Sequence, residues 1–411
     1  MTTRRAFLAR VAATAGVATA ARAGALDLSA LAGAAPTRAG PTPRSPGRLV
    51  VVFLRGGQDA LSTVVPYTRS SYHDARPTIA VPADVVLDLD GEWGLHPALP
   101  QLHDLYGARR LAVVVCTGNP AQDESHFGAQ DLMEYGETTA GGSNRGWLAR
   151  ALHATARPSD SVFRAVTVGH RVDRSLRGTP AVGLSSIAGF GLEHSARVGR
   201  RPEQMLRAGY RGASPVATTG IRTLDAIRRL GAVRGTRDPD RRGQHFSDAA
   251  TLLDSDLGVD VITVNIYGWD THTEMGTHAA GRMRGLLDGL DAHLGAFQVE
   301  LDRRGLTDVT TVVMTEFGRR FDENGSGGTD HGNGMHMFVL GGPVRGGRVV
   351  GRWGPPVDDQ GARNVARTTD FRDVLGELVT GVLGVPAATV FPGHRVMPLG
   401  LLAASPRVAR A

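Results

Sequence analysis

Several common residue types are absent or scarce in this chain of 411 residues. It contains no lysine, so all 46 of its basic residues are arginine, a bias that we attribute to a GC-rich genome. It contains one cysteine, Cys116, which excludes an intramolecular disulfide. Aromatic residues make up only 5%, so the core must rest on valine, leucine, alanine and isoleucine.

A clustered basic surface is also missing. The net charge is +6, and four of the arginines responsible for it lie in residues 1–23. The richest basic stretch elsewhere, residues 199–212, has the spacing of a solvated helix face, and nowhere do we find a clustered basic face with a set of stacking aromatics. We therefore expect no nucleic-acid partner.

The amino terminus has the pattern of an export signal. Arg4 and Arg5 precede a weakly apolar stretch rich in alanine and glycine, and Ala-x-Ala sites follow at 18–20 and 21–23. This predicts a twin-arginine signal peptide over residues 1–23 and a periplasmic or extracellular protein. Residues 24–47 are predicted to be a disordered linker. No later stretch reaches 18 unbroken apolar residues, so we expect no transmembrane anchor.

Residues 48–402 alternate between apolar runs and helical patterns. The predicted strands are 48–54, 110–116, 165–169, 260–266, 309–315 and 337–342, and the predicted helices are 97–106, 129–136, 144–155, 278–304 and one from residue 371. Nearly continuous apolar strands that alternate with helices predict an α/β sandwich around a mostly parallel sheet. Residues 185–245 break the alternation with two arginine-rich helical patterns, and we interpret them as a small inserted helical cap.

Polar side chains that bind metals or transfer protons follow the predicted strands. Ligand sites of α/β sheets collect at the carboxyl ends of strands, so these residues become candidates for one site. They are Arg55, Asp59, Ser125, His126, Asp270, His272, Glu316, Arg319, Asp330 and His331. Asp59 and Ser125 are equally well explained as helix N-caps.

The candidates suggest metal and anion chemistry. Carboxylates and imidazoles together suit divalent zinc or manganese. Glycines beside Asp330 and His331 allow the backbone to approach a ligand closely. A serine at the start of a helix lies at the positive end of the helix dipole, and Arg55 or Arg319 could clamp a phosphate there.

The motifs VFLRGGQDAL, SHFGAQDLMEYG, GWDTH, TEFGR and TDHGNG occur in this order. Together with the leader they resemble the exported proteins grouped as domain of unknown function 1501, over residues 48 to 402. That family is similar to the alkaline phosphatase-like superfamily of phosphatases, sulfatases and phosphoglycerate mutases. The resemblance implies a three-layer, doubly wound α/β core and a site for two divalent metals.

Residue by residue, the resemblance assigns roles to the candidates. Ser125 matches the attacking nucleophile, and Asp270, His272 and His331 match one metal site. Asp59 and Glu316 lie nearer the second metal, where the superfamily has Asp-His and this chain has Glu316 and Phe317. Because phenylalanine cannot bind a metal, a site with one ion is an alternative to the two-ion site that the resemblance implies. Cys116 also lacks the C-x-P-x-R context that typical sulfatases modify.

Two functions follow from these patterns. The first is an exported metal-dependent hydrolase of phosphate or related esters, in which Ser125 attacks and Arg319 binds the small anionic substrate. The second is a non-catalytic binding protein on the same fold, and the family resemblance implies that it joins an exported partner protein in an envelope assembly. The substitution at Phe317 favours the second.

Overall fold

A computed structural model describes residues 26–27, 46–121, 124–139, 141–156, 161–190, 201–212, 214–233, 240–359 and 362–403. The predicted signal peptide, residues 1–23, lies outside the described residues. So does the predicted linker over 24–47, apart from residues 26–27 and 46–47.

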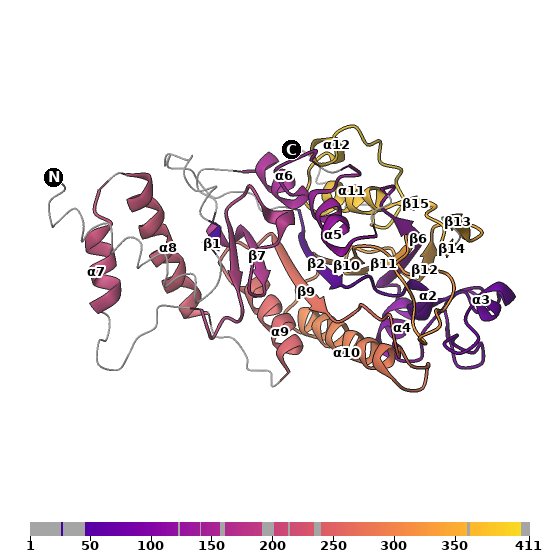
Figure 1. Cartoon of the computed structure of the whole chain (residues 1–411). Coiled ribbons are helices and arrows are strands. Elements are labelled where there is room, and N and C mark those ends of the chain that lie inside the picture. The colour runs from indigo at the N-terminus through magenta and orange to yellow at the C-terminus, as the bar shows by residue number, and fades with distance from the viewer. Residues whose placement is uncertain are drawn as a thin grey trace.

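A large mixed sheet forms the centre of the molecule (Figure 1). Its strands are ordered β1-β8-β7-β9-β2-β10-β11-β6-β12, and β15 also pairs with β6. They are β1 (Leu26–Asp27), β2 (Arg48–Arg55), β6 (Leu111–Gly118), β7 (Ala165–Val168), β8 (Ala181–Leu184), β9 (Val261–Tyr267), β10 (Val309–Thr315), β11 (Met335–Gly341), β12 (Arg348–Val350) and β15 (Thr369–Asp370). Pairing is parallel except where β1 meets β8 and where β11 lies between β10 and β6. The prediction of a mostly parallel sheet is confirmed.

Helices cover both faces of the sheet (Figure 1). One layer holds α4 (Pro100–Gly107), α9 (Arg241–Asp254) and α10 (Arg282–Arg303), and the other holds α5 (His126–Tyr135), α6 (Trp147–Ala154), α11 (Phe371–Gly381) and α12 (Ala387–Val390). Strand β2 shows why two layers are needed. Its residues Val50, Val52 and Leu54 pack into one apolar core, while Leu49, Val51 and Phe53 pack into the other. The predicted α/β sandwich is therefore confirmed, with a helix in each of the five predicted helical stretches.

Smaller elements complete the chain. Helices α2 (Ala60–Thr63) and α3 (Ser70–Ala75) accompany a three-stranded sheet of β3 (Val64–Val65), β4 (Leu87–Asp88) and β5 (Gly94–Leu95). Strands β13 (Val357–Asp359) and β14 (Ala362–Asn364) form a hairpin, and short 3-10 turns cover Val162–Arg164 and Arg174–Leu176.

Helices α7 (Arg201–Gly209) and α8 (Pro215–Ala232) occupy the region predicted to be a cap. They stand side by side at the left of Figure 1, beyond the β1 end of the sheet. Arg207 on α7 joins the two helices through an ion pair to Asp225 on α8, and it also pairs with Glu203 on its own helix. Their function as a cap stays a prediction.

The direction of the strands brings four loops to one edge of the sheet, because the loop that follows β10 is the same loop that precedes β11. Strands β2, β6, β9 and β10 end there, as the pairings of Leu54 with Thr315 and of Arg55 with Tyr267 indicate. Because β11 is antiparallel to its neighbours, it begins at the same edge, where Met335 pairs with Thr117. The glycine-rich loop before β11 therefore meets the loops that follow the other strands.

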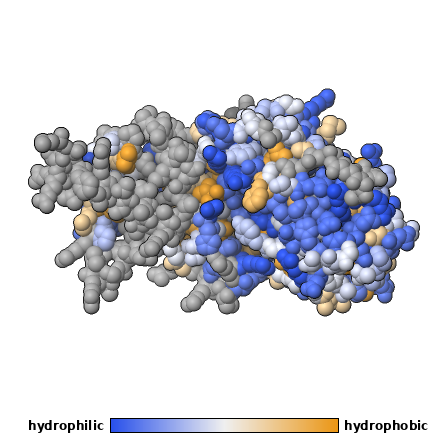
Figure 2. Space-filling view, in the orientation of Figure 1, coloured by the Kyte–Doolittle hydropathy of each residue, from blue (hydrophilic) through white to orange (hydrophobic). Residues whose placement is uncertain are grey.

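The described surface is largely hydrophilic on the face shown in Figure 2, with apolar residues in small groups. None of the described helices combines the length and the hydrophobicity that crossing a membrane requires.

Candidate metal centre

Three histidines surround the carboxylate of Asp270 at this edge. The distances from Asp270 Oδ1 are 3.5 Å to His126 Nε2, 3.1 Å to His272 Nε2 and 3.4 Å to His331 Nε2. The Nε2 atoms of His272 and His331 lie 2.9 Å apart. The four residues come from the first position of α5, the loop after β9 and the glycine-rich loop. The structure thus brings together the Asp270, His272 and His331 of the predicted metal site and adds His126.

The other ring nitrogen of each histidine faces an oxygen acceptor. The pairs are His126 Nδ1 with Glu316 Oε1 (2.8 Å), His272 Nδ1 with Asp330 Oδ1 (3.1 Å) and His331 Nδ1 with the carbonyl oxygen of Glu124 (2.7 Å). An ionised carboxylate or a carbonyl only accepts hydrogen bonds, so in each pair Nδ1–H is the donor. The neutral ring then carries a lone pair on Nε2, which is the arrangement typical of metal-bound histidine.

The converging Nε2 atoms fit a bound cation. Two lone pairs 2.9 Å apart repel each other unless a positive charge lies between or beside them. His126 Nε2 is buried and makes no hydrogen bond, and a buried polar atom without a partner is costly. The ligand atoms of His126, Asp270 and His331 lie within 4.8 Å of one another. The donor set therefore suits a divalent metal.

Arg319 holds the loops of the site together. Its guanidinium is fully buried and donates to the carbonyl oxygens of Gly57 (2.6 Å) and Thr329 (2.8 Å), as well as to Asp270. Burial raises the pKa of Asp270, but the hydrogen bond and charge of Arg319 outweigh it and lower the pKa to about 2. Arg319 therefore keeps Asp270 ionised, whereas the sequence suggested that it binds a substrate anion.

Glu316 lies behind His126 and contacts it directly. Its Oε1 accepts hydrogen bonds from His126 Nδ1, from Gln130 Nε2 (2.9 Å) and from the backbone N–H of Gly56 (2.9 Å). Burial raises the pKa of Glu316, but its hydrogen bonds, led by those from His126 and Gln130 and completed by backbone N–H groups, together lower it by more. Its contacts make Glu316 a support for a ligand, where the sequence suggested a ligand itself.

Asp59 is the buried N-cap of α2. Its Oδ1 accepts from the backbone N–H of Ser62 (2.8 Å) and pairs with Arg76 (2.8 Å), and its Oδ2 accepts from Thr329 (2.9 Å). Within the described part of the chain, the one group of converging metal ligands does not include Asp59. Of its two sequence interpretations, cap and ligand, the contacts agree with the cap.

Two further candidates, Ser125 and Arg55, differ in exposure. Ser125 is exposed, occupies the N-cap position of α5 and directly precedes His126. Arg55 is buried and forms ion pairs with Glu134 (2.7 Å) and Asp173 (3.5 Å). Arg55 is therefore committed to protein partners, away from solvent.

The pKa values of two candidate ligands, His126 and His331, are shifted in opposite directions. The hydrogen bond from His126 to Glu316 raises the pKa of His126, although burial opposes it. Burial and the charge of Arg319 lower the pKa of His331. Glu316 therefore affects the candidate metal centre indirectly, because its hydrogen bond with His126 raises the pKa of that histidine.

Sequence reasoning missed three supporting residues. Gln130 donates to Glu316, the Glu124 carbonyl binds His331, and Asn324 donates to Asp330 (2.9 Å). Gln130 had a usable signal, because it stands four residues after His126 on the same helix face. The other two depend on loop geometry, which has no sequence period.

Comparison with known families shows to which family the chain belongs. Residues 47–408 match the model of the family described as "Protein of unknown function (DUF1501)". The chain belongs to this family. No curated protein sequence matches it.

Solved structures with similar folds include sulfatases and an alkaline phosphatase, all at low identity. Lipoteichoic acid synthase LtaP from Listeria monocytogenes is 11% identical with a TM-score of 0.37, over 90% of this chain and 79% of that one. A putative sulfatase from Bacteroides thetaiotaomicron is 9% identical with a TM-score of 0.38, over 86% and 76%. A mutant TAB5 alkaline phosphatase with bound Mg is 9% identical with a TM-score of 0.33, over 75% and 95%.

Proposed function

We propose that this member of the family is a metal-dependent hydrolase of phosphate or related esters. The observation that carries the proposal is the convergence of three Nε2 atoms on Asp270, each histidine having its Nδ1 bonded to an oxygen. Three imidazoles and a carboxylate favour zinc, with manganese as the second choice. His126, Asp270, His272 and His331 would hold the ion.

One ion fits this site better than two. The carboxylates expected at a second metal, Asp59 and Glu316, have both oxygens engaged by protein hydrogen-bond partners. Phe317 offers no ligand atom, and its ring packs against His126 and His331 at centroid distances of 5.0 and 4.8 Å. The chain therefore lacks uncommitted ligands for a second ion among these candidates.

Ser125 is the proposed nucleophile. It is exposed at the head of α5, next to a metal ligand, where the helix dipole favours an anion. Its Oγ forms a bond to phosphorus while the ester P–O bond breaks, and the alcohol leaves with the proton released by the hydroxyl. Water then cleaves the phosphoserine, which restores the hydroxyl and yields phosphate. A bound divalent ion supplies positive charge for the ester oxygens.

Metal content and turnover test this proposal together. Elemental mass spectrometry is expected to find one ion in the wild type, none in His272→Ala and one in His153→Ala, a variant of an exposed histidine on α6. Ser125→Ala is expected to keep its ion and to lose turnover of p-nitrophenyl phosphate or sulfate. A wild type without metal overturns the metal centre, and full turnover by Ser125→Ala overturns the nucleophile.

A second candidate is a binding protein that has lost its chemistry. Arg319, whose guanidinium contacts Asp270, is committed to protein acceptors, and Phe317, whose ring packs against His126 and His331, offers no ligand atom. Both observations favour a site that holds metal without processing an ester. One bound ion, no turnover of either ester and co-purification of a stable partner protein would favour this reading.

Export is part of the same proposal. Arg4, Arg5 and the alanine-rich stretch after them support transport by the twin-arginine route to the periplasm or the cell exterior. Fusion of residues 1–47 to a reporter that requires this route tests it, with Arg4 and Arg5 changed to glutamine as the control.

A further inference from the structure

Helix α5 carries a polar stripe that reaches from the metal centre into the sandwich. His126, Gln130 and Glu134 are spaced four residues apart, so they lie along one face of the helix. His126 and Gln130 both contact Glu316 at the end of β10. Gln130 and Glu134 both contact Arg55 at the end of β2, at 3.2 and 2.7 Å. The stripe therefore connects a metal ligand to a buried ion pair.

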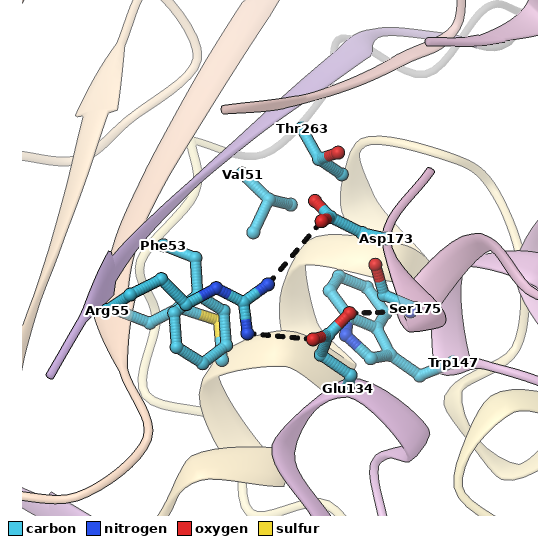
Figure 3. Close-up of a pocket in the computed structure, with 9 residues that line it drawn as sticks. Val51, Phe53, Arg55, Glu134, Trp147, Asp173, Ser175 and Thr263 are labelled. Atoms are coloured by element: carbon cyan, nitrogen blue, oxygen red, sulfur yellow. Dashed lines mark hydrogen bonds and ion pairs between the residues drawn. The ribbon is translucent and has the colours of Figure 1, made fainter. Parts of the chain in front are cut away.

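The ion pair at the far end of the stripe is enclosed and fully engaged. Figure 3 shows the Arg55 guanidinium between the Glu134 and Asp173 carboxylates, beside Phe53. Arg55 Nε also donates to Asn265 (2.7 Å), and the guanidinium lies 3.8 Å from the ring centroid of Phe53. The second oxygen of Glu134 accepts from the backbone N–H of Ser175 (3.0 Å). These contacts fix the rotation of α5 about its axis.

Gln130 transmits this constraint because its amide has only one orientation that fits. A guanidinium only donates hydrogen bonds and an ionised carboxylate only accepts them. The Gln130 oxygen must therefore face Arg55, and its NH₂ group must face Glu316. Glu316 in turn accepts from His126 Nδ1, which sets the direction of His126 Nε2.

We propose that Gln130 and Glu134 are positioning residues for the metal centre: with Arg55, they orient Glu316 and α5 so that His126 Nε2 is directed at the ion. The proposal rests on the proposed metal site, though not on catalysis. Loss of a hydrogen-bonded support of this kind weakens metal binding by about 10- to 100-fold.

The test is a competition assay with a coloured chelator on the full chain, with Co²⁺ and Zn²⁺ as the probes. Gln130→Leu is expected to raise the dissociation constant about 10- to 100-fold and to change the visible spectrum of bound Co²⁺, which reports ligand number and geometry. In a His126→Ala background the same substitution is expected to have no further effect, because the ligand through which it acts is gone.

The control variant breaks a comparable ion pair elsewhere. Arg164 and Asp260 form a part-buried pair (2.6 Å) next to the start of β9, at the other end of that strand from Asp270. Asp260→Asn is expected to lower stability and to leave the affinity for Co²⁺ unchanged. Glu134→Gln keeps the size of the side chain and is expected to raise the dissociation constant for Co²⁺ as Gln130→Leu does. If Gln130→Leu fails to fold, Glu134→Gln alone provides the test.

The outcomes separate the two proposals. A wild type that binds neither metal overturns the metal centre and this inference with it. If the wild type binds metal and both Gln130→Leu and Glu134→Gln bind it with the same affinity, only this inference is overturned. Equal losses of affinity in the wild-type and His126→Ala backgrounds, or an equal loss in Asp260→Asn, also overturn it.

Discussion

At the scale of single residues, the centre is organised by the atoms that face away from it. Each histidine donates its Nδ1–H to an oxygen, so its Nε2 lone pair is available at the centre. Arg319 does the same for Asp270, because its charge keeps that carboxylate ionised. In the proposed metal centre, the candidate ligands would be poorly directed without these contacts, although none of the supporting atoms would need to touch the ion.

The buried pair of Asp59 and Arg76 separates a structural role from a metal-binding one. Both side chains are fully buried, so Asp59→Asn leaves the Arg76 charge without a partner. Breaking such a pair costs about 3–5 kcal/mol, which chemical denaturation would measure as a lower free energy of unfolding. We expect the metal content to remain at one ion.

Glu92→Gln is the matched control for this substitution. Glu92 pairs with Arg69 at 3.3 Å on the surface, where ion pairs contribute about 0–1 kcal/mol. If Asp59→Asn folds but binds no metal, the prediction is wrong and Asp59 is a metal ligand.

At the scale of elements, the site exists because one strand runs against its neighbours. Strand β11 is antiparallel to β10 and β6, so the loop before it returns to the edge where β2, β9 and β10 end. Asp330 and His331 lie in that loop, only a few residues before β11. In a sheet with β11 reversed, they would lie at the opposite edge, away from Asp270.

Gly56, directly after β2, lets two of these loops touch. It has a φ of +122°, and a Cβ there would lie 2.6 Å from the backbone nitrogen of Asp270. Gly56→Ala is therefore expected to lower the free energy of unfolding by more than about 1 kcal/mol. It should also weaken Zn²⁺ binding in a chelator competition, since the loop has to move away from Asp270.

Gly91→Ala isolates the effect of backbone strain. Gly91 has a φ of +84°, and a Cβ there would meet nothing within 4 Å. We expect a loss of stability with unchanged metal affinity. Equal metal affinity in Gly56→Ala and the wild type would contradict the close approach described here.

At the scale of the whole molecule, stability depends on histidines outside the metal centre. His96 Nδ1 accepts from the backbone N–H of Ala98 (3.0 Å), and His336 Nδ1 accepts from that of Cys116 (3.0 Å). Both rings must be neutral at Nδ1 to accept these bonds. Burial lowers the pKa of each to about 4.

Stability is therefore expected to fall as the pH drops from about 6.5 to about 4. Above pH 6.5 these histidines are neutral in both states; below it the unfolded chain takes up protons that the folded chain excludes. Each histidine then lowers the free energy of unfolding by up to about 1.4 kcal/mol per pH unit. Urea unfolding at several pH values would show this slope.

His96→Asn and His336→Asn serve as the test variants, because an asparagine oxygen can replace Nδ1 as an acceptor. Both are expected to flatten the slope, whereas the exposed His153→Asn should leave it unchanged. A wild-type stability that is constant from pH 6.5 to 4 would contradict these pKa shifts.

The sequence by itself determined the layers of the fold. Apolar runs such as 48–54 and 309–315 are continuous because the strands are buried on both faces, so they were recognisable without coordinates. The same reasoning found Asp270, His272 and His331, because strand ends are where polar residues of such sheets collect. The motif set also indicated the family, which the match over residues 47–408 confirms.

Only the tertiary structure decided which candidate does what. Asp59, Glu316 and Arg319 are chemically able to bind a metal or an anion, but their partners Arg76, Gln130 and the Gly57 carbonyl lie far away in the sequence. No local pattern records such long-range contacts. His126 shows the converse: the sequence left its role open, and the folding of α5 against β10 directs its Nε2 at Asp270. Residue types set the chemistry available, and packing determines which atoms remain to carry it out.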